Sequence, residues 1–427
     1  MDKLLLKKMA VQSVALMIAV ITLSYALRQY SSHTLVLASD IGSAEAASID
    51  SEEELKPYPV EEITRPSLPE DIRPDEDGEE KEEAGLPGML DDIDMEIVRQ
   101  LGEKLIIIKK PMSGHITMEL QDIYINKSIK LTFNSSEPYR MKAEDIGRIN
   151  LQDTYIGMPV FTEIEEVVSN LDGSTKTVVA RDYGKDIVHG ISFSNQEIES
   201  NIVELTLELD TVYAHSILED ELYYYIGLKK PSEVYDKIIV LDAGHGGKDA
   251  GALSKDDSVY EKNVILAILL EVKELLDKEN IKVYYTRLGD DKVFLRPRVE
   301  LANAVDCDYF ISIHCNASGS TKPGGTEIFY YGTEFKQVST KALATIFSEE
   351  IEKATSLRNR GLVSLKKDDV FILNHSQVPA VLIETGYMTN LKDLEYMNQK
   401  VNQKAIARGI YNGILRAYDE LPPIVNN

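Results

Sequence analysis

The stretch VLDAGHGGKDAGA, residues 240–252, joins an apolar run to a loop that contains four glycines and one histidine, His245. Glycine adopts positive φ angles without strain and lets the backbone approach other groups closely. Ligand sites in open α/β sheets lie just beyond the carboxyl ends of the strands. Two interpretations are therefore open for this stretch. It is either a tight turn that holds a histidine by chance, or a loop that presents His245 to a ligand.

Residues 235–422, which surround this stretch, alternate short apolar segments with amphipathic ones. Residues 260–280 and 401–420 have the apolar spacing of helices that cover a sheet. The apolar runs between the helical segments are short and rich in β-branched and aromatic residues. This alternation predicts an α/β domain in which helices flank a mostly parallel sheet.

Three of the predicted strands lead into a side chain that can bind a metal or accept a proton. The runs IIVLDAGH, YFISIH and AVLIE end at His245, His314 and Glu384. The carboxyl ends of parallel strands meet at one edge of a sheet. We therefore expect these three side chains to lie near one another, which favours a functional site over a chance turn.

Glu261 opens the amphipathic helix that follows the glycine loop. An acid in the first turn of a helix is common, because it interacts favourably with the helix dipole. Alternatively, Glu261 joins His245 and His314 as a zinc ligand, since two histidines and a carboxylate leave a fourth tetrahedral position for water. Glu384 would then accept the proton of that water as general base. The chain has no HExxH motif, so the helix-borne zinc pattern is absent.

Eight motifs follow one another between residue 237 and about residue 420. They are LDAGHGGKDAGA, YEKN, YYTRLGD, FLRPRVELAN, FISIHCNAS, GGTEIFYY, NRGL and PAVLIETGYMTN. In this order they resemble the zinc-dependent N-acetylmuramoyl-L-alanine amidases of bacterial cell walls. Two departures are mild: Cys315 stands where a small residue is usual, and SKDDSVY (254–260) replaces a more glycine-rich stretch. Arg287 and Arg298 also match family positions, and we interpret both as structural ion-pair formers.

The resemblance implies a zinc site of His245, Glu261 and His314, with Glu384 as the catalytic acid and base. It also implies that peptidoglycan is the substrate. The bond cleaved would be the amide between N-acetylmuramic acid and the L-alanine of the stem peptide. The enzyme implied is thus a hydrolase of the autolysin type that acts in cell-wall organization.

Two other functions are weighed against this one. A zinc-dependent cell-wall peptidase would use the same histidines and glutamates, and only the specific run of motifs speaks against it. A non-catalytic, membrane-tethered peptidoglycan-binding protein is the second alternative. Such a protein would be expected to have lost a ligand or the base, whereas His245, Glu261, His314 and Glu384 are all present.

The N-terminal residues 1–28 are predicted to anchor the chain in a membrane. Residues 9–27 carry no charge, and three lysines precede them. This length is near the lower limit for a membrane-spanning helix, and the lysines favour a cytoplasmic N-terminus. The predicted location is the cell membrane, with a single pass and the catalytic domain on the cell-wall side. Cleavage as a signal peptide, which would release the protein, is the alternative.

Residues 29–98 are predicted to be an acidic, proline-rich linker. Between residues 40 and 98 there are 21 acidic and 4 basic residues, which account for most of the chain's net charge of −25. Such a composition cannot bury enough apolar surface to fold alone, and prolines and like charges keep it extended. The acidic balance also argues against nucleic acid as a partner.

Residues 99–230 are predicted to form a smaller all-β module. Apolar and polar residues alternate there with a period of two, and Ile, Val, Thr and Tyr are abundant. This pattern is typical of half-buried strands in a β-sandwich. By position and strand pattern the module resembles the AMIN-type domains that precede such amidases. That resemblance implies a possible envelope or division partner.

Overall fold

The computed structural model describes residues 92–422, except 113, 152, 170–174, 195–198, 333, 336 and 367–368. The predicted membrane anchor (1–28) and nearly all of the predicted linker (29–98) lie outside the described residues. Within the described part of the chain, no helix is both long enough and apolar enough to cross a membrane.

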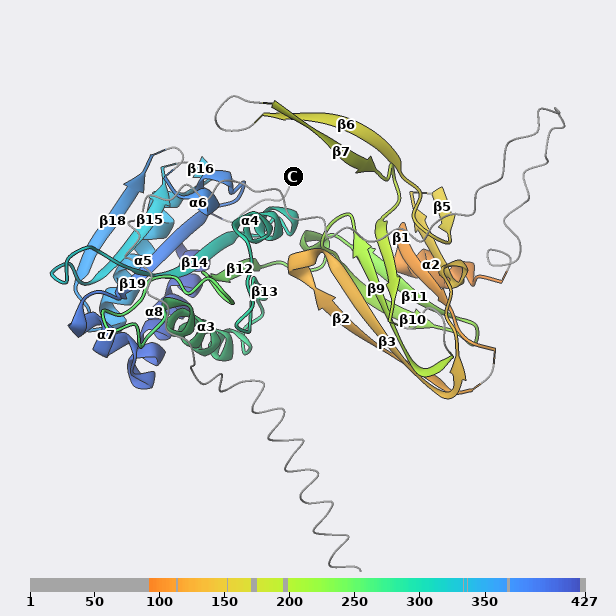
Figure 1. Cartoon of the computed structure of the whole chain (residues 1–427), viewed down its shortest axis with the longest axis horizontal. Helices are drawn as coiled ribbons and strands as arrows, with labels where there is room; N and C mark the ends of the chain where they lie inside the picture. Colours follow the sequence, from red (N-terminus) through yellow and green to blue (C-terminus); the bar gives the residue numbers. More distant parts are fainter. Residues whose placement is uncertain are drawn as a thin grey trace, which may run out of the picture. The chain divides into compact units, whose positions relative to one another are not determined.

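The C-terminal domain is built on one six-stranded sheet (Figure 1). Its strands, in spatial order, are β13 (Lys282–Tyr285), β12 (Ile238–Ala243), β14 (Tyr309–Asn316), β19 (Ala380–Tyr387), β15 (Thr326–Tyr331) and β18 (Asn359–Leu365). Neighbours pair in parallel except β15 and β19, which are antiparallel. The α/β architecture therefore agrees with the sequence, but the sheet is mixed.

Helices cover both faces of this sheet because its central strands are apolar on both sides. On β12, Ile239 and Leu241 pack into one core and Ile238 and Val240 into the other. The first core includes residues of α3 (Glu261–Leu276), α5 (Thr340–Ala354) and α8 (Lys400–Glu420). The second includes residues of α4 (Leu295–Ala304) and α6 (Phe371–His375). A strand buried on both faces is typical of sheets that helices sandwich.

Helices α5 and α8 approach each other closely at two glycines of α8. A Cβ atom on Gly409 would lie 2.8 Å from the Cα of Ile351, and one on Gly413 would lie 2.6 Å from the ring of Phe347. The first contact is with backbone, which cannot move aside cheaply. The absence of a side chain at Gly409 therefore sets the distance between the two helices.

We expect Gly409→Val to lower the free energy of unfolding by about 1–3 kcal/mol, because it overpacks this contact. The measurement is urea unfolding of the full-length chain. Asp419→Val, on an exposed position of the same helix, is the control for the helix propensity of valine. Equal stability of the two variants would contradict the close packing of α5 against α8.

The remaining elements of the C-terminal domain are short. Helix α7 (Leu391–Met397) follows β19, and β16 (Glu334–Phe335) pairs with β17 (Val338–Ser339) in a small antiparallel ribbon before α5.

The N-terminal module has two antiparallel sheets and a hairpin. One sheet has the order β10 (Ala214–Glu219), β11 (Tyr223–Lys229), β1 (Lys104–Lys109), β4 (Ile146–Asn150), β5 (Asp153–Ile156). The other has the order β2 (Ile116–Ile123), β3 (Ser128–Tyr139), β9 (Ser200–Leu209), β8 (Val188–Phe193). The hairpin consists of β6 (Thr162–Ser169) and β7 (Thr175–Asp182). Residues of both sheets share one apolar core, as expected of a sandwich.

A short helix, α2 (Met95–Leu101), begins inside the segment predicted as a linker. The side chain of Asp94 caps it by accepting a hydrogen bond from the amide of Glu96 at 2.8 Å, and Leu101 is buried. The helix therefore spans the predicted boundary at residue 98, and its acidic cap and first turn share the composition of the predicted linker.

Candidate active site

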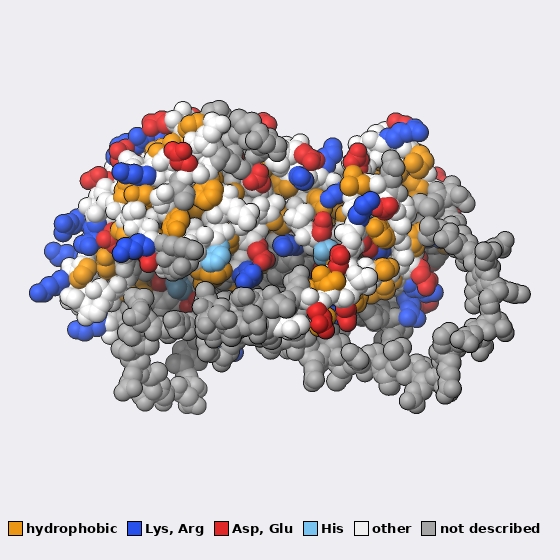
Figure 2. Space-filling model, turned by 90° about the horizontal axis from the view of Figure 1, so that it is seen from above, with side chains coloured by type: hydrophobic (Ala, Val, Ile, Leu, Met, Phe, Trp, Pro, Cys, Tyr) orange, Lys and Arg blue, Asp and Glu red, His pale blue; other side chains and the backbone are white. Residues whose placement is uncertain are grey.

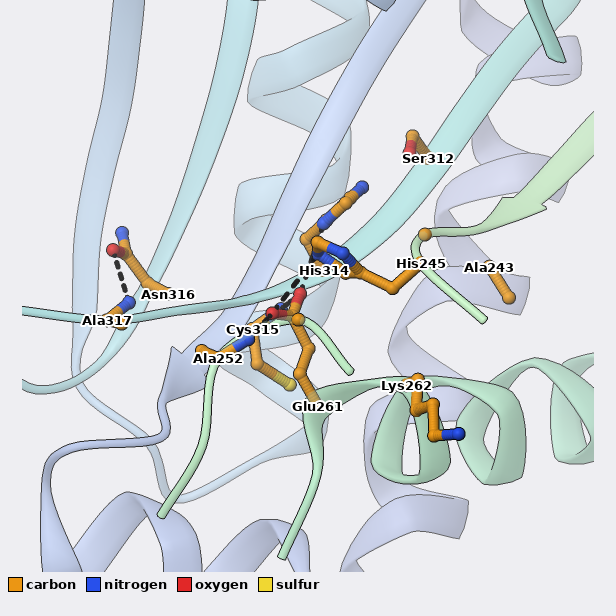
Figure 3. Close-up of polar contacts among 12 residues, drawn as sticks. Ala243, His245, Ala252, Glu261, Lys262, Ser312, His314, Cys315, Asn316 and Ala317 are labelled. Carbon is orange, nitrogen blue, oxygen red and sulfur yellow. Dashed lines mark hydrogen bonds and ion pairs between the residues drawn. The ribbon is translucent and has the colours of Figure 1, made fainter. Parts of the chain in front are cut away.

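The residues predicted from three strand ends lie at one edge of the six-stranded sheet. Figure 3 shows two of them, His245 and His314, beside Glu261. Strands β12, β14 and β19 are neighbours and run parallel. His314 on β14 is the direct Cα partner of Glu384 on β19. His245 follows the end of β12 by two residues. The helix α3 brings Glu261 to the same edge, since Glu261 is its first residue.

The glycines of the loop after β12 make room for the polar side chains around them. A Cβ atom on Gly244 would collide with the imidazole of His314. Gly251 has φ of +68°, and a Cβ there would lie 2.6 Å from Oε2 of Glu261. His245 itself has φ of +58°, a left-handed conformation that is uncommon outside glycine. The loop therefore holds its histidine in a strained but specific position.

Glu261 is buried and lies between the two histidines. Its Oε2 is 3.2 Å from Nε2 of His245, and its Oε1 is 3.1 Å from Nδ1 of His314. Two backbone amides also donate to it, Ala252 to Oε2 at 2.7 Å and Cys315 to Oε1 at 2.8 Å. Burial opposes ionisation, but the hydrogen bonds and charges of the histidines lower the pKa of Glu261 below its usual value. The carboxylate is therefore charged.

His245, Glu261 and His314 have the chemistry and spacing of a metal site. One ligand atom from each lies within 4.8 Å of the others. Each carboxyl oxygen of Glu261 lies 3.1 or 3.2 Å from a nitrogen of one histidine, so both imidazoles are within reach of an ion bound at this carboxylate. Two imidazoles and one carboxylate are ligands that zinc accepts. The residues present thus fit the ion that the sequence suggests.

Asp249 contacts the ring nitrogen of His245 that points away from Glu261. Its Oδ1 lies 3.0 Å from Nδ1 of His245 and accepts a hydrogen bond from the amide of Gly251 at 3.1 Å. Burial lowers the pKa of His245, yet its hydrogen bonds to Asp249 and Glu261 raise that pKa to about 10. Asp249 was not predicted. A carboxylate four residues after a candidate ligand histidine was the available signal, because such carboxylates orient metal-binding imidazoles.

Glu384 has a carboxyl oxygen that is shielded from solvent and free of hydrogen bonds. Among the described residues, its Oε2 is one of a few buried polar atoms without a partner. Burial and the nearby charges of Glu261 and Glu327 raise the pKa of Glu384 well above its usual value. A carboxyl group in this state takes up and holds a proton readily, which suits an acid or base.

A second buried glutamate, Glu327, lies next to Glu384 and was not predicted. The two are direct partners on the antiparallel strands β15 and β19. Glu327 accepts hydrogen bonds from Arg360 at 2.7 Å, from Tyr387 at 2.8 Å and from Asn316 at 2.9 Å. Arg360 therefore compensates the negative charge of Glu327. Oε2 of Glu384 has no such partner among the described residues.

The two arginines interpreted as ion-pair formers differ. Arg298 pairs with the buried carboxylate of Asp242 at 2.5 Å and donates to the carbonyl of His245 at 2.7 Å. The hydrogen bonds of Arg287 go to backbone carbonyls, among them those of Ala243 and Gly244, at 2.9 and 2.8 Å. Among the described residues Arg287 has no ion pair, so that interpretation was wrong for it. Both arginines fix the backbone that carries His245.

Comparisons with known proteins identify the family of the C-terminal domain. A family model described as N-acetylmuramoyl-L-alanine amidase matches residues 239–416. YqiI of Bacillus subtilis, an uncharacterized protein, is 33% identical over 43% of this chain and 86% of its own length. The N-acetylmuramoyl-L-alanine amidase CwlM of Bacillus licheniformis is 34% identical over 42% of this chain and 68% of its own length.

Solved structures match over the same share of the chain. The catalytic domain of CwlV, an N-acetylmuramoyl-L-alanine amidase from Bacillus (Paenibacillus) polymyxa var. colistinus, is 34% identical and has a TM-score of 0.40. That match covers 43% of this chain and 98% of the CwlV domain. The family match lies in the C-terminal domain, where the candidate site is. By its sequence relatives, the chain belongs to the N-acetylmuramoyl-L-alanine amidase family.

Proposed function

We propose that this amidase uses zinc, held by His245, Glu261 and His314, to hydrolyse the amide between N-acetylmuramic acid and the L-alanine of the stem peptide in peptidoglycan. One observation carries the proposal. The three candidate ligands converge beside Glu384, whose shielded Oε2 has no hydrogen bond. When bound, zinc supplies a Lewis acid that polarises a carbonyl and activates a water molecule.

Glu384 has the properties that the proton transfers of amide hydrolysis require. Its carboxylate accepts a proton from the attacking water, and the same carboxyl then donates a proton to the departing amine of L-alanine. The raised pKa of Glu384 favours the second step, because a general acid must hold the proton that it donates. The pairing of Glu384 with His314 on the neighbouring strand supports this role.

The loop after β12 keeps its shape through contacts that leave the candidate ligands free. Arg298 and Arg287 bind the carbonyls of residues 243–245 and hold the backbone in place. Fixed ligands reduce the reorganisation needed when substrate binds, which is the main benefit of a preorganised site.

A peptidase acting on the stem peptide would use the same zinc chemistry. Membership of the amidase family weighs against it, and the two differ in their products. A non-catalytic binding protein is disfavoured because both histidines and both glutamates are present and meet at one place.

The products of peptidoglycan digestion test the proposed reaction. The full-length chain is incubated with purified peptidoglycan, and the soluble products are analysed by mass spectrometry. We expect free stem peptides that begin with L-alanine, and we expect them to disappear when zinc is chelated and to return when zinc is added back. Shortened stems still attached to muramic acid would instead identify a peptidase.

We expect Asp249→Asn to weaken zinc binding by about 10–100-fold, the usual cost of removing the carboxylate that orients a ligand histidine. The measurement is competition for zinc against a chelator of known affinity. The control is Asp256→Asn, in the same loop region, whose carboxylate accepts hydrogen bonds from Ser254 and Ser258. Unchanged zinc affinity in the Asp249 variant would show that its contact with His245 has no part in metal binding.

We also propose that the chain is anchored in the cell membrane through residues 1–28, with the amidase domain on the cell-wall side. The uncharged run and its preceding lysines support this. A partner in the cell envelope for the β module is part of the same proposal, on the ground of its position before the amidase domain.

A further inference from the structure

A hollow of about 680 Å³ lies in the amidase domain at the ends of strands β14 and β19. We call it the cationic pocket. Its basic side chains are Lys322, Arg358 and Lys392, and its apolar ones include Leu357, Leu391 and Tyr396. None of these residues belongs to the candidate zinc site, and the proposed mechanism does not use them.

The pocket lies at the same edge of the sheet as the zinc site. Beyond His314 and Glu384, β14 and β19 continue to Asn316 and Tyr387, which are again partners. The loops that follow both strands line the pocket. A strand advances by about 3.3 Å per residue, so the pocket begins about 10–20 Å from Glu384.

The walls of the cationic pocket are tied together. Asn390 donates to the carbonyls of Thr321 and Pro323 at 3.1 and 3.0 Å, and Thr389 accepts a hydrogen bond from the amide of Ser318 at 3.1 Å. These bonds join the loop after β14 to the loop after β19. The hollow is thus a feature of the fold and does not depend on one mobile side chain.

The pocket carries uncompensated positive charge. Within the described part of the chain, Lys322, Arg358 and Lys392 form no ion pair. The acid at the pocket, Asp393, is buried and is used in hydrogen bonds from the amides of Gly325 and Tyr387, at 2.7 and 3.0 Å. Lys and Arg side chains gather at the left-hand end of the view in Figure 2, where α7 and β18 lie in Figure 1.

The proposed substrate has its negative charge on one side of the scissile bond. The lactyl carboxyl of muramic acid is consumed in the amide, and the amino groups of the sugars are acetylated, so the glycan side is neutral. The peptide side carries carboxylates, including that of its C-terminus. Four extended residues span about 13 Å, which is enough to reach from the scissile amide to the pocket.

We infer that the cationic pocket is the subsite for a carboxylate of the stem peptide, with Leu357, Leu391 and Tyr396 contacting its alkyl groups. The inference rests on the proposed function, because it takes the direction of the substrate from the scissile amide. It adds a determinant of specificity: stems that end in a free carboxylate bind better than stems whose carboxylate is blocked.

The test compares two muramoyl tetrapeptides that differ only at the C-terminus, one with a carboxylate and one with a carboxamide. Their binding to the full-length chain is measured by calorimetry with Glu384→Gln present, so that no turnover occurs. We expect the carboxylate form to bind about tenfold more tightly, a size typical of a few exposed charge contacts. Adding Lys322→Gln, Arg358→Gln and Lys392→Gln should abolish the difference by weakening only the carboxylate form.

The matched control replaces three cations at the far end of α3 and on α8, Lys278, Lys404 and Arg408, by glutamine. It changes the net charge equally and should keep the preference. Equal binding of both tetrapeptides, or a preference that survives the pocket substitutions, would overturn the inference. So would displacement by glycerol phosphate without a carboxylate preference, because the pocket would then serve a phosphate polymer. Cleavage of peptidoglycan by the unsubstituted chain is scored separately, so failure of the proposed function is distinguishable from failure of the subsite.

Discussion

Glu384→Gln is expected to lower kcat for release of stem peptides by about 10³-fold while the zinc content of the protein stays the same. Glutamine has the shape of glutamate but cannot accept the proton of the attacking water or return one to the leaving amine. Glu384 makes no hydrogen bond through Oε2, so the exchange breaks none of the contacts that hold the candidate ligands. The effect should therefore fall on the chemical step. The measurements are peptide release from purified peptidoglycan and metal analysis of the same samples.

Glu395→Gln, an exposed glutamate on α7, is the matched control and should leave kcat unchanged. Loss of zinc from the Glu384 variant would show that this residue is a ligand. Retention of nearly full activity would remove it from the mechanism and direct attention to another base.

Glu261→Gln should remove both zinc and activity, with zinc affinity falling more than about 100-fold. Losing a residue that only orients a ligand lowers metal affinity by about 10–100-fold. The loss expected here is larger, because Glu261 is itself a proposed charged ligand. Glutamine also fits badly. Oε1 and Oε2 each accept a backbone amide, from Cys315 and Ala252, so the amide nitrogen of glutamine would face a donor in either orientation. The measurement is zinc stoichiometry after gel filtration, followed by peptide release.

Glu274→Gln makes the same substitution on an exposed position of the same helix and should bind zinc normally. A Glu261 variant that retains stoichiometric zinc at unchanged affinity would contradict the proposed ligand set. Comparing the Glu261 and Glu384 variants separates a ligand from a base, because the Glu261 variant is expected to lose zinc and the Glu384 variant to keep it.

Much of the site could be predicted because it depends on strand ends. An apolar run marks a strand in any sequence, and parallel neighbours bring their carboxyl ends together. His245, His314 and Glu384 therefore come together because their strands, β12, β14 and β19, are parallel neighbours in the sheet. Glu261 was harder, since a first-turn acid has a purely structural explanation. Its place between two imidazoles became visible only in the fold.

Other features depend on contacts that have no local pattern. Strand β15 pairs antiparallel with β19, but its apolar sequence pattern is the same as that of a parallel strand. The sequence therefore does not show the direction of β15. Glu327 lies on β15, and its burial beside Glu384 follows from that pairing. Asp249 lies in an irregular loop, so no helix or strand periodicity in the sequence marks it as functional. Helix α2 is short, and its acidic residues resemble those of the predicted linker sequence before it.

The glycines around His245 have a physical explanation in the structure. The loop turns beyond β12, and His314 and Glu261 occupy the space that side chains at Gly244 and Gly251 would need. Glycine leaves that space open, and His245, which stands between Gly244 and Gly246, reaches Glu261. The loop is therefore shaped around the candidate ligands.

Anomalous X-ray diffraction from crystals of the full-length chain, recorded on both sides of the zinc absorption edge, tests the central claim most directly. The account predicts one strong zinc peak, about 2.0–2.2 Å from His245, Glu261 and His314, with Glu384 beside it and not among the ligands. An active protein with no zinc peak among these three side chains, or with the peak on a different set of residues, would contradict it.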